Sequence, residues 1–116
     1  MLSLFRKPRH KEIPAQQLAA LLDQKRAILV DVRESDEFAS GHVAGALSMP
    51  LSRFQASALP AGDKPVILTC AAGRRSAMAL DKAAAARPDI DTHLAGGMVA
   101  WRAAGLRSEE HTSELQ

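Results

Sequence analysis

Two short apolar runs restrict the folds that this chain can adopt. They are AILVDV, residues 27–32, and VILTC, residues 66–70. Runs of this length and character are typical of strands that are buried on both faces, as in a parallel sheet. Because segments with helical character follow each run, strands and helices alternate along the chain. We therefore expect an α/β fold in one domain, with a mostly parallel central sheet flanked by helices on both faces.

Helix and turn signals place the other elements. Residues 75–86 are rich in strong helix formers and stop before Pro88, through which a helix does not continue easily. Met78 and the alanines of this segment are expected on its buried face. Further helices are expected over residues 14–23, 34–40, 51–59 and 98–105, and further strands over 45–50 and within 91–97.

The charge and cysteine counts exclude several classes of protein. The 15 Lys and Arg residues against 13 Asp and Glu give a formal net charge of +2, too small to indicate a nucleic-acid partner. The one cysteine cannot form an intramolecular disulfide or a Cys-rich zinc site. We therefore expect no metal centre and a reduced, cytoplasmic setting. No apolar run is long enough to span a membrane.

The two ends of the chain differ from its middle. Residues 1–11 form a basic arm, expected to be a solvated terminus rather than a membrane-surface or partner-binding segment, and residues 12–106 form the domain. Residues 107–116, RSEEHTSELQ, are polar and without apolar periodicity, and they resemble the conceptual translation of a sequencing-library adapter. We expect this tail to be non-native, to replace the true C-terminus and to make few contacts with the core.

The chain's one thiol lies in the loop CAAGRRS, residues 70–76, between a predicted strand and a predicted helix. Ligands of parallel sheets gather at the carboxyl ends of the strands, where Cys70 is expected. Small residues and Gly73 let the backbone curl, so that its N–H groups and the helix N-terminus point at the sulfur and lower its pKa. Arg74 and Arg75 add positive charge, which favours an anionic, electrophilic substrate. The alternative is a buried cysteine with a purely structural role.

The chain resembles a single-domain rhodanese, a sulfurtransferase, over roughly residues 13–106. The first matching segment is LVDVRESDEFASGHVAGALSMP, residues 29–50, which fits the family pattern of strand, acidic helix and G-H-x-x-G-A. The loop CAAGRRS matches C-x-x-G-x-R-S, and LAGGMVAWRAAGL, residues 94–106, matches the closing L-x-G-G, W and G. Together these motifs are highly specific.

The resemblance implies a double displacement in which Cys70 is the catalytic residue and carries a persulfide. The donor would be a small anion such as thiosulfate, or a persulfide, and the acceptor a thiol or cyanide, with a protein acceptor as a further option. It implies no cofactor or metal. Arg75 would hold the loop, and the more exposed Arg74 would meet the donor. The active loop that cradles the persulfide would consist of Ala71, Ala72, Gly73, Arg74, Arg75 and Ser76.

Three other functions remain open on the same resemblance. Rhodanese-like phosphatases and arsenate reductases carry one more residue between the cysteine and the arginine, whereas four separate Cys70 from Arg75 here. The shorter loop favours sulfur transfer. Some rhodanese-like domains are non-catalytic docking modules, although these commonly lack the cysteine. A dedicated persulfide carrier for one protein partner would have the same sequence as a free enzyme.

Several other residues have structural interpretations that we prefer. Asp31 and Arg33 are expected to pair or cap at a strand end, although Arg33 could line the mouth of the site. His42 is expected to order a turn rather than to act as a general base for Cys70. His93 has no partner that the sequence identifies, and Trp101 is expected in the core.

Overall fold

The computed structural model describes residues 10–109, which form one five-stranded sheet in the order β1-β5-β4-β2-β3. All four neighbouring pairs are parallel. The sheet and fold class therefore agree with the expectation from the sequence. The strands are β1 (Lys11–Ile13), β2 (Ile28–Asp31), β3 (Leu47–Ser48), β4 (Val66–Thr69) and β5 (Thr92–Leu94).

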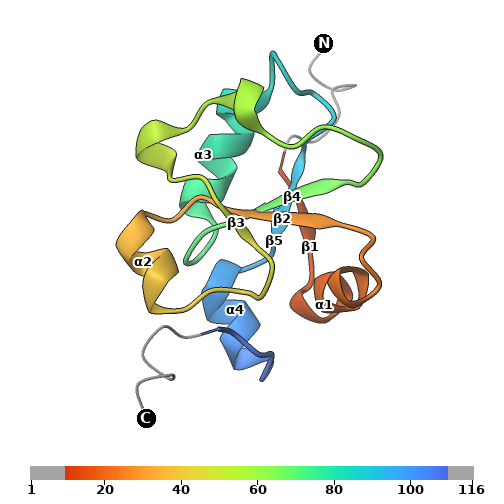
Figure 1. Ribbon diagram of the computed structural model, residues 1–116, viewed down its shortest axis with the longest axis vertical. Helices are drawn as coiled ribbons and strands as arrows, with labels where there is room; N and C mark the ends of the chain where they lie inside the picture. Colours follow the sequence, from red (N-terminus) through yellow and green to blue (C-terminus); the bar gives the residue numbers. More distant parts are fainter. Residues whose placement is uncertain (1–9, 110–116) are drawn as a thin grey trace, which may run out of the picture.

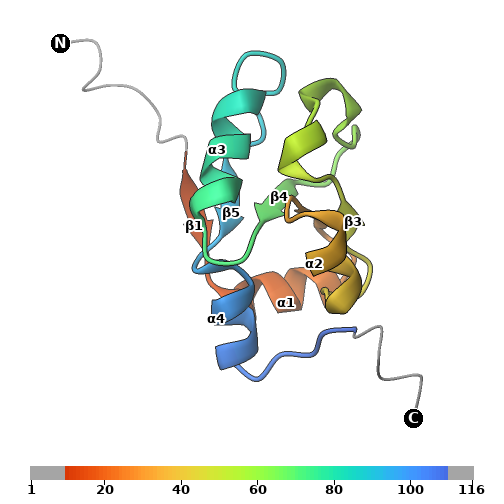
Figure 2. The same ribbon diagram turned by 90° about the vertical axis from the view of Figure 1, so that its left-hand side faces the viewer.

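Helices cover both faces of the sheet (Figures 1 and 2). On one face lie α1 and α4, and on the other lie α3 and two 3-10 turns, while α2 lies near β3. The helices are α1 (Ala15–Asp23), α2 (Ser35–Ser40), α3 (Arg74–Ala83) and α4 (Gly97–Ala103), and the 3-10 turns are η2 (Leu51–Arg53) and η3 (Ala56–Ala58).

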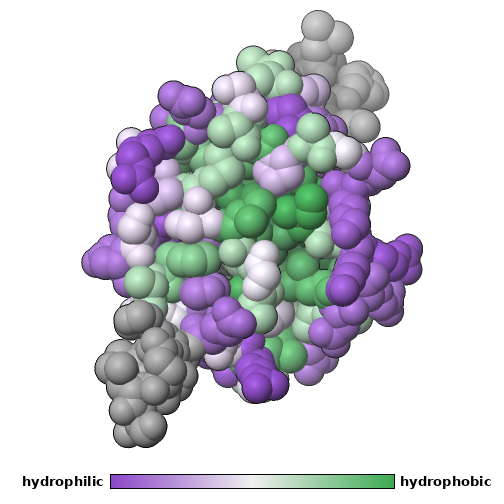
Figure 3. Space-filling model, viewed as in Figure 1, coloured by the Kyte–Doolittle hydropathy of each residue, from purple (hydrophilic) through white to green (hydrophobic). Residues whose placement is uncertain are grey.

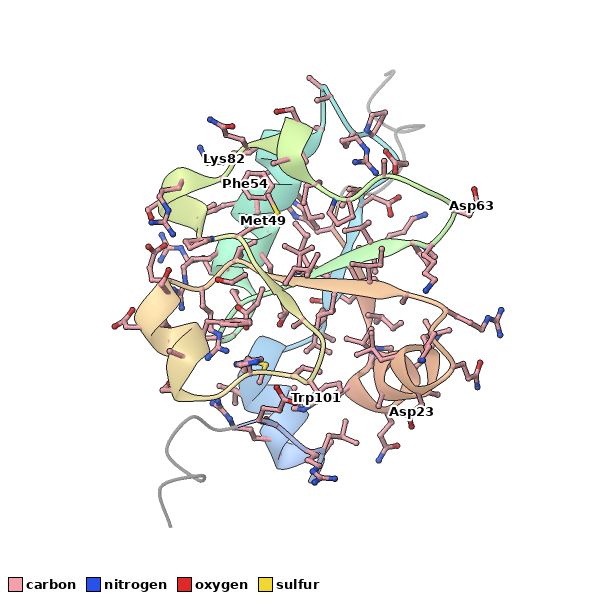
Figure 4. The ribbon with its side chains drawn as sticks, in the orientation of Figure 1. Asp23, Met49, Phe54, Asp63, Lys82 and Trp101 are labelled. Carbon is pink, nitrogen blue, oxygen red and sulfur yellow. The ribbon has the colours of Figure 1, made fainter. Side chains whose placement is uncertain are left out.

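The apolar side chains of the central strands divide between two cores because successive residues of a strand point to opposite faces. Leu29 and Ile67 join the core under α1 and α4. Trp101 of α4 also belongs to this core, and its side chain lies on the side of α4 that faces α1 (Figure 4). Val30 and Leu68 join the core under α3. In the view of Figure 1, hydrophobic residues gather over β2 and β4, and hydrophilic residues surround them (Figure 3).

The register of the central strands determines where the site lies. Asp31, the last residue of β2, pairs with Thr69, the last residue of β4, so both strands end at the same edge. Cys70 follows Thr69 directly, and α3 begins four residues later at Arg74. The thiol therefore lies at the carboxyl edge of the sheet.

Four local expectations need correction. Residues 51–59 form two separate 3-10 turns rather than one helix, since Arg53 and Phe54 donate to carbonyls three residues back. Helix α3 ends at Ala83 rather than at residue 86. Met78 is 45% exposed, because the buried face of α3 is made by Ser76, Ala79, Leu80 and Ala83.

The fourth correction concerns the segment before the first helix. Lys11 belongs to strand β1, which extends the sheet by pairing with β5, and not to a solvated arm. The strand has only three residues, two of them exposed and charged, so it carries no apolar pattern. Residues 1–9 of the predicted basic arm lie outside the described residues.

The first residues of the C-terminal tail contact the domain, contrary to the expectation of few contacts. Glu109 forms an antiparallel bridge with His42, with backbone N–H to O distances of 2.8 and 2.6 Å. Trp101 donates from Nε1 to the carbonyl of Arg107 at 3.0 Å. Residues 110–116, the rest of this tail, lie outside the described residues.

Candidate active site

Cys70 sits inside a tight loop that joins β4 to α3. Its side chain is buried, with 1% of the residue exposed. Gly73, the N-cap residue of α3, adopts a φ of 116°, a conformation that residues with a Cβ atom rarely take. This conformation lets the N–H of Gly73 donate to Sγ of Cys70 at 3.1 Å. The Ser76 hydroxyl lies 3.4 Å from the same sulfur.

The loop rests on the N-terminus of α4. Met98 and Val99 donate their N–H groups to the carbonyls of Cys70 and Ala71, both at 2.9 Å. A Cβ atom on Gly97 would lie 2.5 Å from the carbonyl oxygen of Cys70, so only glycine allows this approach. The glycine pair of the closing motif therefore lets the N-terminus of α4 approach the active loop and hold it through backbone hydrogen bonds.

Hydrogen bonds lower the pKa of the Cys70 thiol against the effect of its burial. Burial of the sulfur favours the neutral thiol and raises the pKa. The Ser76 hydroxyl and the backbone N–H groups of Ser76, Gly73 and Ala72 favour the thiolate, and their combined effect is larger. The pKa of Cys70 is therefore below its ordinary value, which makes the sulfur a better nucleophile near neutral pH.

Arg75 ties the loop to α2. Its guanidinium binds both carboxylate oxygens of Glu37, at 2.7 and 3.0 Å. This contact lowers the pKa of Glu37 to about 2 and raises the pKa of Arg75, mainly through the hydrogen bonds between the two groups. Arg74 is exposed and forms no ion pair within residues 10–109. Since Glu37 compensates the charge of Arg75, Arg74 is the cation of the loop left open to a ligand.

Ser76 connects the sulfur to a histidine that sequence reasoning did not assign. Nδ1 of His93, on β5, lies 2.6 Å from the Ser76 hydroxyl oxygen. Both residues are buried. The sequence offered one signal for His93: it is a polar residue directly before the closing L-x-G-G motif. In the structure this position lies on β5, which pairs with β4.

Asp31 and Arg33 form a buried pair. Nη2 of Arg33 lies 2.8 Å from Oδ2 of Asp31 and 2.7 Å from the carbonyl oxygen of Gly41. The exposed fractions of Asp31 and Arg33 are 0% and 3%, so their charged groups face the protein rather than an open site mouth. Their contacts bind the end of β2 to the end of α2.

His42 orders the segment after α2. Its Nδ1 lies 2.8 Å from the carbonyl oxygen of Phe38, and its ring stacks on the Phe38 ring at 3.8 Å. Nε2 lies 3.3 Å from Oε1 of Glu109. These contacts hold a turn, and none of them connects His42 to Cys70.

Other features of residues 10–109 do not add to the site. A pocket of about 700 Å³ lies between α1, α4 and residues 106–109, and no residue of the Cys70 loop lines it. No cluster of three or more His, Cys, Asp or Glu side chains that could hold a metal occurs in this range. None of the helices in the described range is long and apolar enough to cross a membrane.

Comparisons with known proteins identify the family of this domain. A family model of the rhodanese-like domain matches residues 14–104. The chain is 42% identical over 95 residues to the uncharacterized protein slr1261 of Synechocystis, covering 81% of this chain and 53% of that protein. It spans about half the length of such curated relatives.

Two solved structures are similar in fold and sequence. A rhodanese-related protein from Thermoplasma volcanium superposes with a TM-score of 0.72 at 27% identity, covering 85% of this chain and 97% of that one. A thiosulfate sulfurtransferase from Pseudomonas aeruginosa gives a TM-score of 0.76 at 26% identity, covering 88% of this chain and 20% of that one. By its motifs, its fold and the family match over most of its length, this chain belongs to the rhodanese-like domain family.

Proposed function

We propose that this protein is a sulfurtransferase that moves a sulfane sulfur from an anionic donor to a thiophilic acceptor through a persulfide on Cys70. The observation that carries the proposal is the position of the sulfur. It lies inside a loop that directs N–H groups at it, 3.1 Å from the nearest donor, and its pKa is lowered despite burial. The sulfurtransferase from Pseudomonas aeruginosa, similar in fold, supports the same chemistry.

The reaction consists of two displacements at sulfur. The Cys70 thiolate attacks the outer sulfur of thiosulfate, the sulfur–sulfur bond of the donor breaks, and sulfite leaves with the electron pair. The product is a Cys70 persulfide anion, which the N–H groups of the loop can stabilise as they stabilise the thiolate. A cyanide ion or a thiolate then attacks the outer sulfur and releases the Cys70 thiolate. Arg74 is the exposed cation that would attract the donor.

The loop size favours this reaction over phosphoryl or arsenate chemistry. Four residues separate Cys70 from Arg75. The Arg75 guanidinium donates two hydrogen bonds to the Glu37 carboxylate. A loop of this size makes a cup suited to one transferred sulfur atom rather than to a tetrahedral oxyanion bonded at its centre. A persulfide needs only the N–H groups.

Intact-mass measurement tests the proposal. Incubation of the purified protein with thiosulfate should add one sulfur atom, and cyanide or a thiol should remove it. The Cys70→Ser variant should keep the fold and gain no sulfur, because a serine oxygen cannot carry a sulfane sulfur.

A generic aryl phosphate provides the second arm of this experiment. The protein should release no phosphate above the Cys70→Ser background. Phosphate release that depends on Cys70, without any persulfide, would reject sulfur transfer in favour of a phosphatase. A persulfide that forms but passes only to a protein acceptor, and not to cyanide or small thiols, would identify a dedicated carrier.

A further inference from the structure

We propose that His93 is a positioning residue for Cys70. It sets the direction in which the Ser76 hydroxyl donates its proton and so allows that hydroxyl to stabilise the Cys70 thiolate. The inference rests on the proposed function, because it takes Cys70 as the reacting thiol. It assigns a role to His93, a buried polar residue that the loop motif and the backbone N–H groups do not explain.

Two successive short contacts connect the side chains of Cys70, Ser76 and His93. Sγ of Cys70 lies 3.4 Å from Oγ of Ser76, which lies 2.6 Å from Nδ1 of His93. Their exposed fractions are 1%, 0% and 4%. Water therefore cannot easily replace either contact, and the proton at each contact is held by one of the two side chains that form it.

The Ser76 hydroxyl carries a single proton and has three places to donate it. They are the carbonyl of Gly73 at 3.2 Å, Nδ1 of His93 and Sγ of Cys70. If Nδ1 is bare, the 2.6 Å contact requires the hydroxyl to donate to it, and the sulfur loses that donor. If Nδ1 carries a proton, it donates to Oγ and leaves the hydroxyl free to donate to the thiolate. The proton on His93 therefore determines what Ser76 does for Cys70.

The same contacts give the thiol proton a way out of a buried site. In the thiol state, S–H donates to Oγ and the hydroxyl donates to Nδ1. When Cys70 ionises, its proton passes to Oγ while the hydroxyl proton passes to Nδ1. The products are a thiolate, a hydroxyl that points to the sulfur, and an imidazolium with protons on both nitrogens. No atom is lost, and no other reactant is required.

The surroundings of His93 act mainly on Nε2, the ring nitrogen that does not face Ser76. Nε2 faces the carboxylate of Glu12 on β1 at 3.9 Å, and Glu12 is largely exposed. The ring of His10, which pairs with Asp81 of α3 at 2.9 Å, lies 6.2 Å from the His93 ring. Burial lowers the pKa of His93, Glu12 opposes this, and His10 adds to it. The Glu12 carboxylate therefore favours a proton on Nε2 and helps to stabilise the imidazolium that forms when Nδ1 takes the Ser76 proton.

Alkylation of the single cysteine tests the proposal without depending on sulfur transfer. The rate of reaction with iodoacetamide is followed by intact mass from pH 5 to pH 10. The wild-type profile should have its inflection below about 8.5, the value of an ordinary thiol. His93→Leu should raise that inflection by about one pH unit, which makes alkylation about tenfold slower below it.

Three variants separate positioning from mere support of the fold. His93→Asn keeps an N–H donor near the position of Nδ1 and should stay within about twofold of the wild type. His10→Leu removes an imidazole from the same neighbourhood and should also stay within about twofold. In a Ser76→Ala background, His93→Leu should have no further effect, because the histidine acts only through the hydroxyl.

Two results would overturn the proposal. One is a folded His93→Leu variant with the wild-type profile, and the other is an effect of His93→Leu that adds fully to that of Ser76→Ala. If His93→Leu does not fold, long-range ¹H–¹⁵N spectra of the wild type decide. They are recorded at a pH above the alkylation inflection, where Cys70 is a thiolate: a proton on Nδ1 supports the proposal, and a bare Nδ1 rejects it. A wild type that shows the expected alkylation pattern but gains no sulfur from thiosulfate would reject the proposed function and leave the role of His93 intact.

Discussion

At the scale of the residue, uncharged donors rather than arginine charge stabilise the sulfur. The Gly73 N–H lies 3.1 Å from Sγ of Cys70, whereas both ends of the Arg75 guanidinium are held by Glu37. The sequence suggested that two arginines would add charge at the site, but it could not reveal that a carboxylate 38 residues away takes one of them. Arg75 therefore fixes the loop, and its charge is largely compensated.

The Arg75–Glu37 pair predicts a stability difference that depends on pH. Glu37→Gln keeps an oxygen that can accept from the N–H of Glu34, as Oε1 does at 3.0 Å, but it removes the negative charge. We expect the variant to melt a few degrees lower than the wild type at pH 7. The difference should be modest, since the two side chains are 31% and 36% exposed and salt screens the pair.

The pKa of Glu37 fixes the pH window of this effect. It falls from 4.5 in the unfolded chain to about 2 in the folded protein, so ionised Glu37 stabilises the fold fully above pH 4.5. That stability is lost as the pH falls toward 2, where the melting temperatures of the two proteins should converge. Thermal melts by circular dichroism between pH 2 and pH 8 measure it. A difference that is constant over this range would show that Glu37 acts through packing and not through charge.

At the scale of the element, the two short apolar runs were the most predictable part of the fold. AILVDV and VILTC form the central strands β2 and β4, because strands buried on both faces need continuous apolar sequence. Edge elements carry weaker signals: β1 has one buried residue in three, and both residues of β3 are exposed. Residues 51–59 are too few to show an apolar periodicity that would distinguish one helix from two 3-10 turns.

The active loop was predictable from sequence, and its supports were not. Cys70, Gly73 and the arginines lie within seven consecutive residues, so local chemistry was enough to single them out. His93 and Gly97 come from β5 and α4, and they reach the loop only because β5 pairs with β4. Contacts between residues distant in sequence need the sheet order, which composition and periodicity do not provide.

The contact between α4 and the loop predicts a severe effect of Gly97→Ala. Gly97 has a φ of 58°, and a Cβ atom would meet the carbonyl oxygens of Cys70 and Ala71 at 2.5 and 2.6 Å. Strain and overlap together should lower the free energy of unfolding by about 2–5 kcal/mol. Persulfide formation should fall with it, because the loop that holds the sulfur must shift. Urea denaturation and thiosulfate loading measure the two effects.

Gly105→Ala is the matched control for this prediction. Gly105 has a φ of 75° at the end of α4, but a Cβ atom there would meet nothing within 4 Å. Only the backbone strain remains, so the loss should be about 1–2 kcal/mol and sulfur loading should not change. If both variants lost the same stability, close packing against the loop would not be the reason for glycine at position 97.

At the scale of the whole molecule, two cores on opposite faces of the sheet meet different parts of the chain. The core under α3 includes Cys70, and partly buried residues such as Leu51 and Phe54 pack against it. The core under α1 and α4 includes Trp101 and Val43, and the chain that follows Leu106 passes along it. Changes to the C-terminal segment should therefore act on the core under α1 and α4 and leave the active loop intact.

Two truncated proteins, one ending at Glu109 and one at Leu106, test this separation. The shorter protein loses two backbone hydrogen bonds with His42 and the bond from Trp101 to the Arg107 carbonyl. At about 0.5–1.5 kcal/mol for each of these three bonds, the loss should be roughly 1.5–4.5 kcal/mol in the free energy of unfolding. The rate of Cys70 alkylation should stay the same in both. Equal stability of the two proteins would show that residues 107–109 merely rest on the domain, and altered alkylation would show that the two faces are coupled through the sheet.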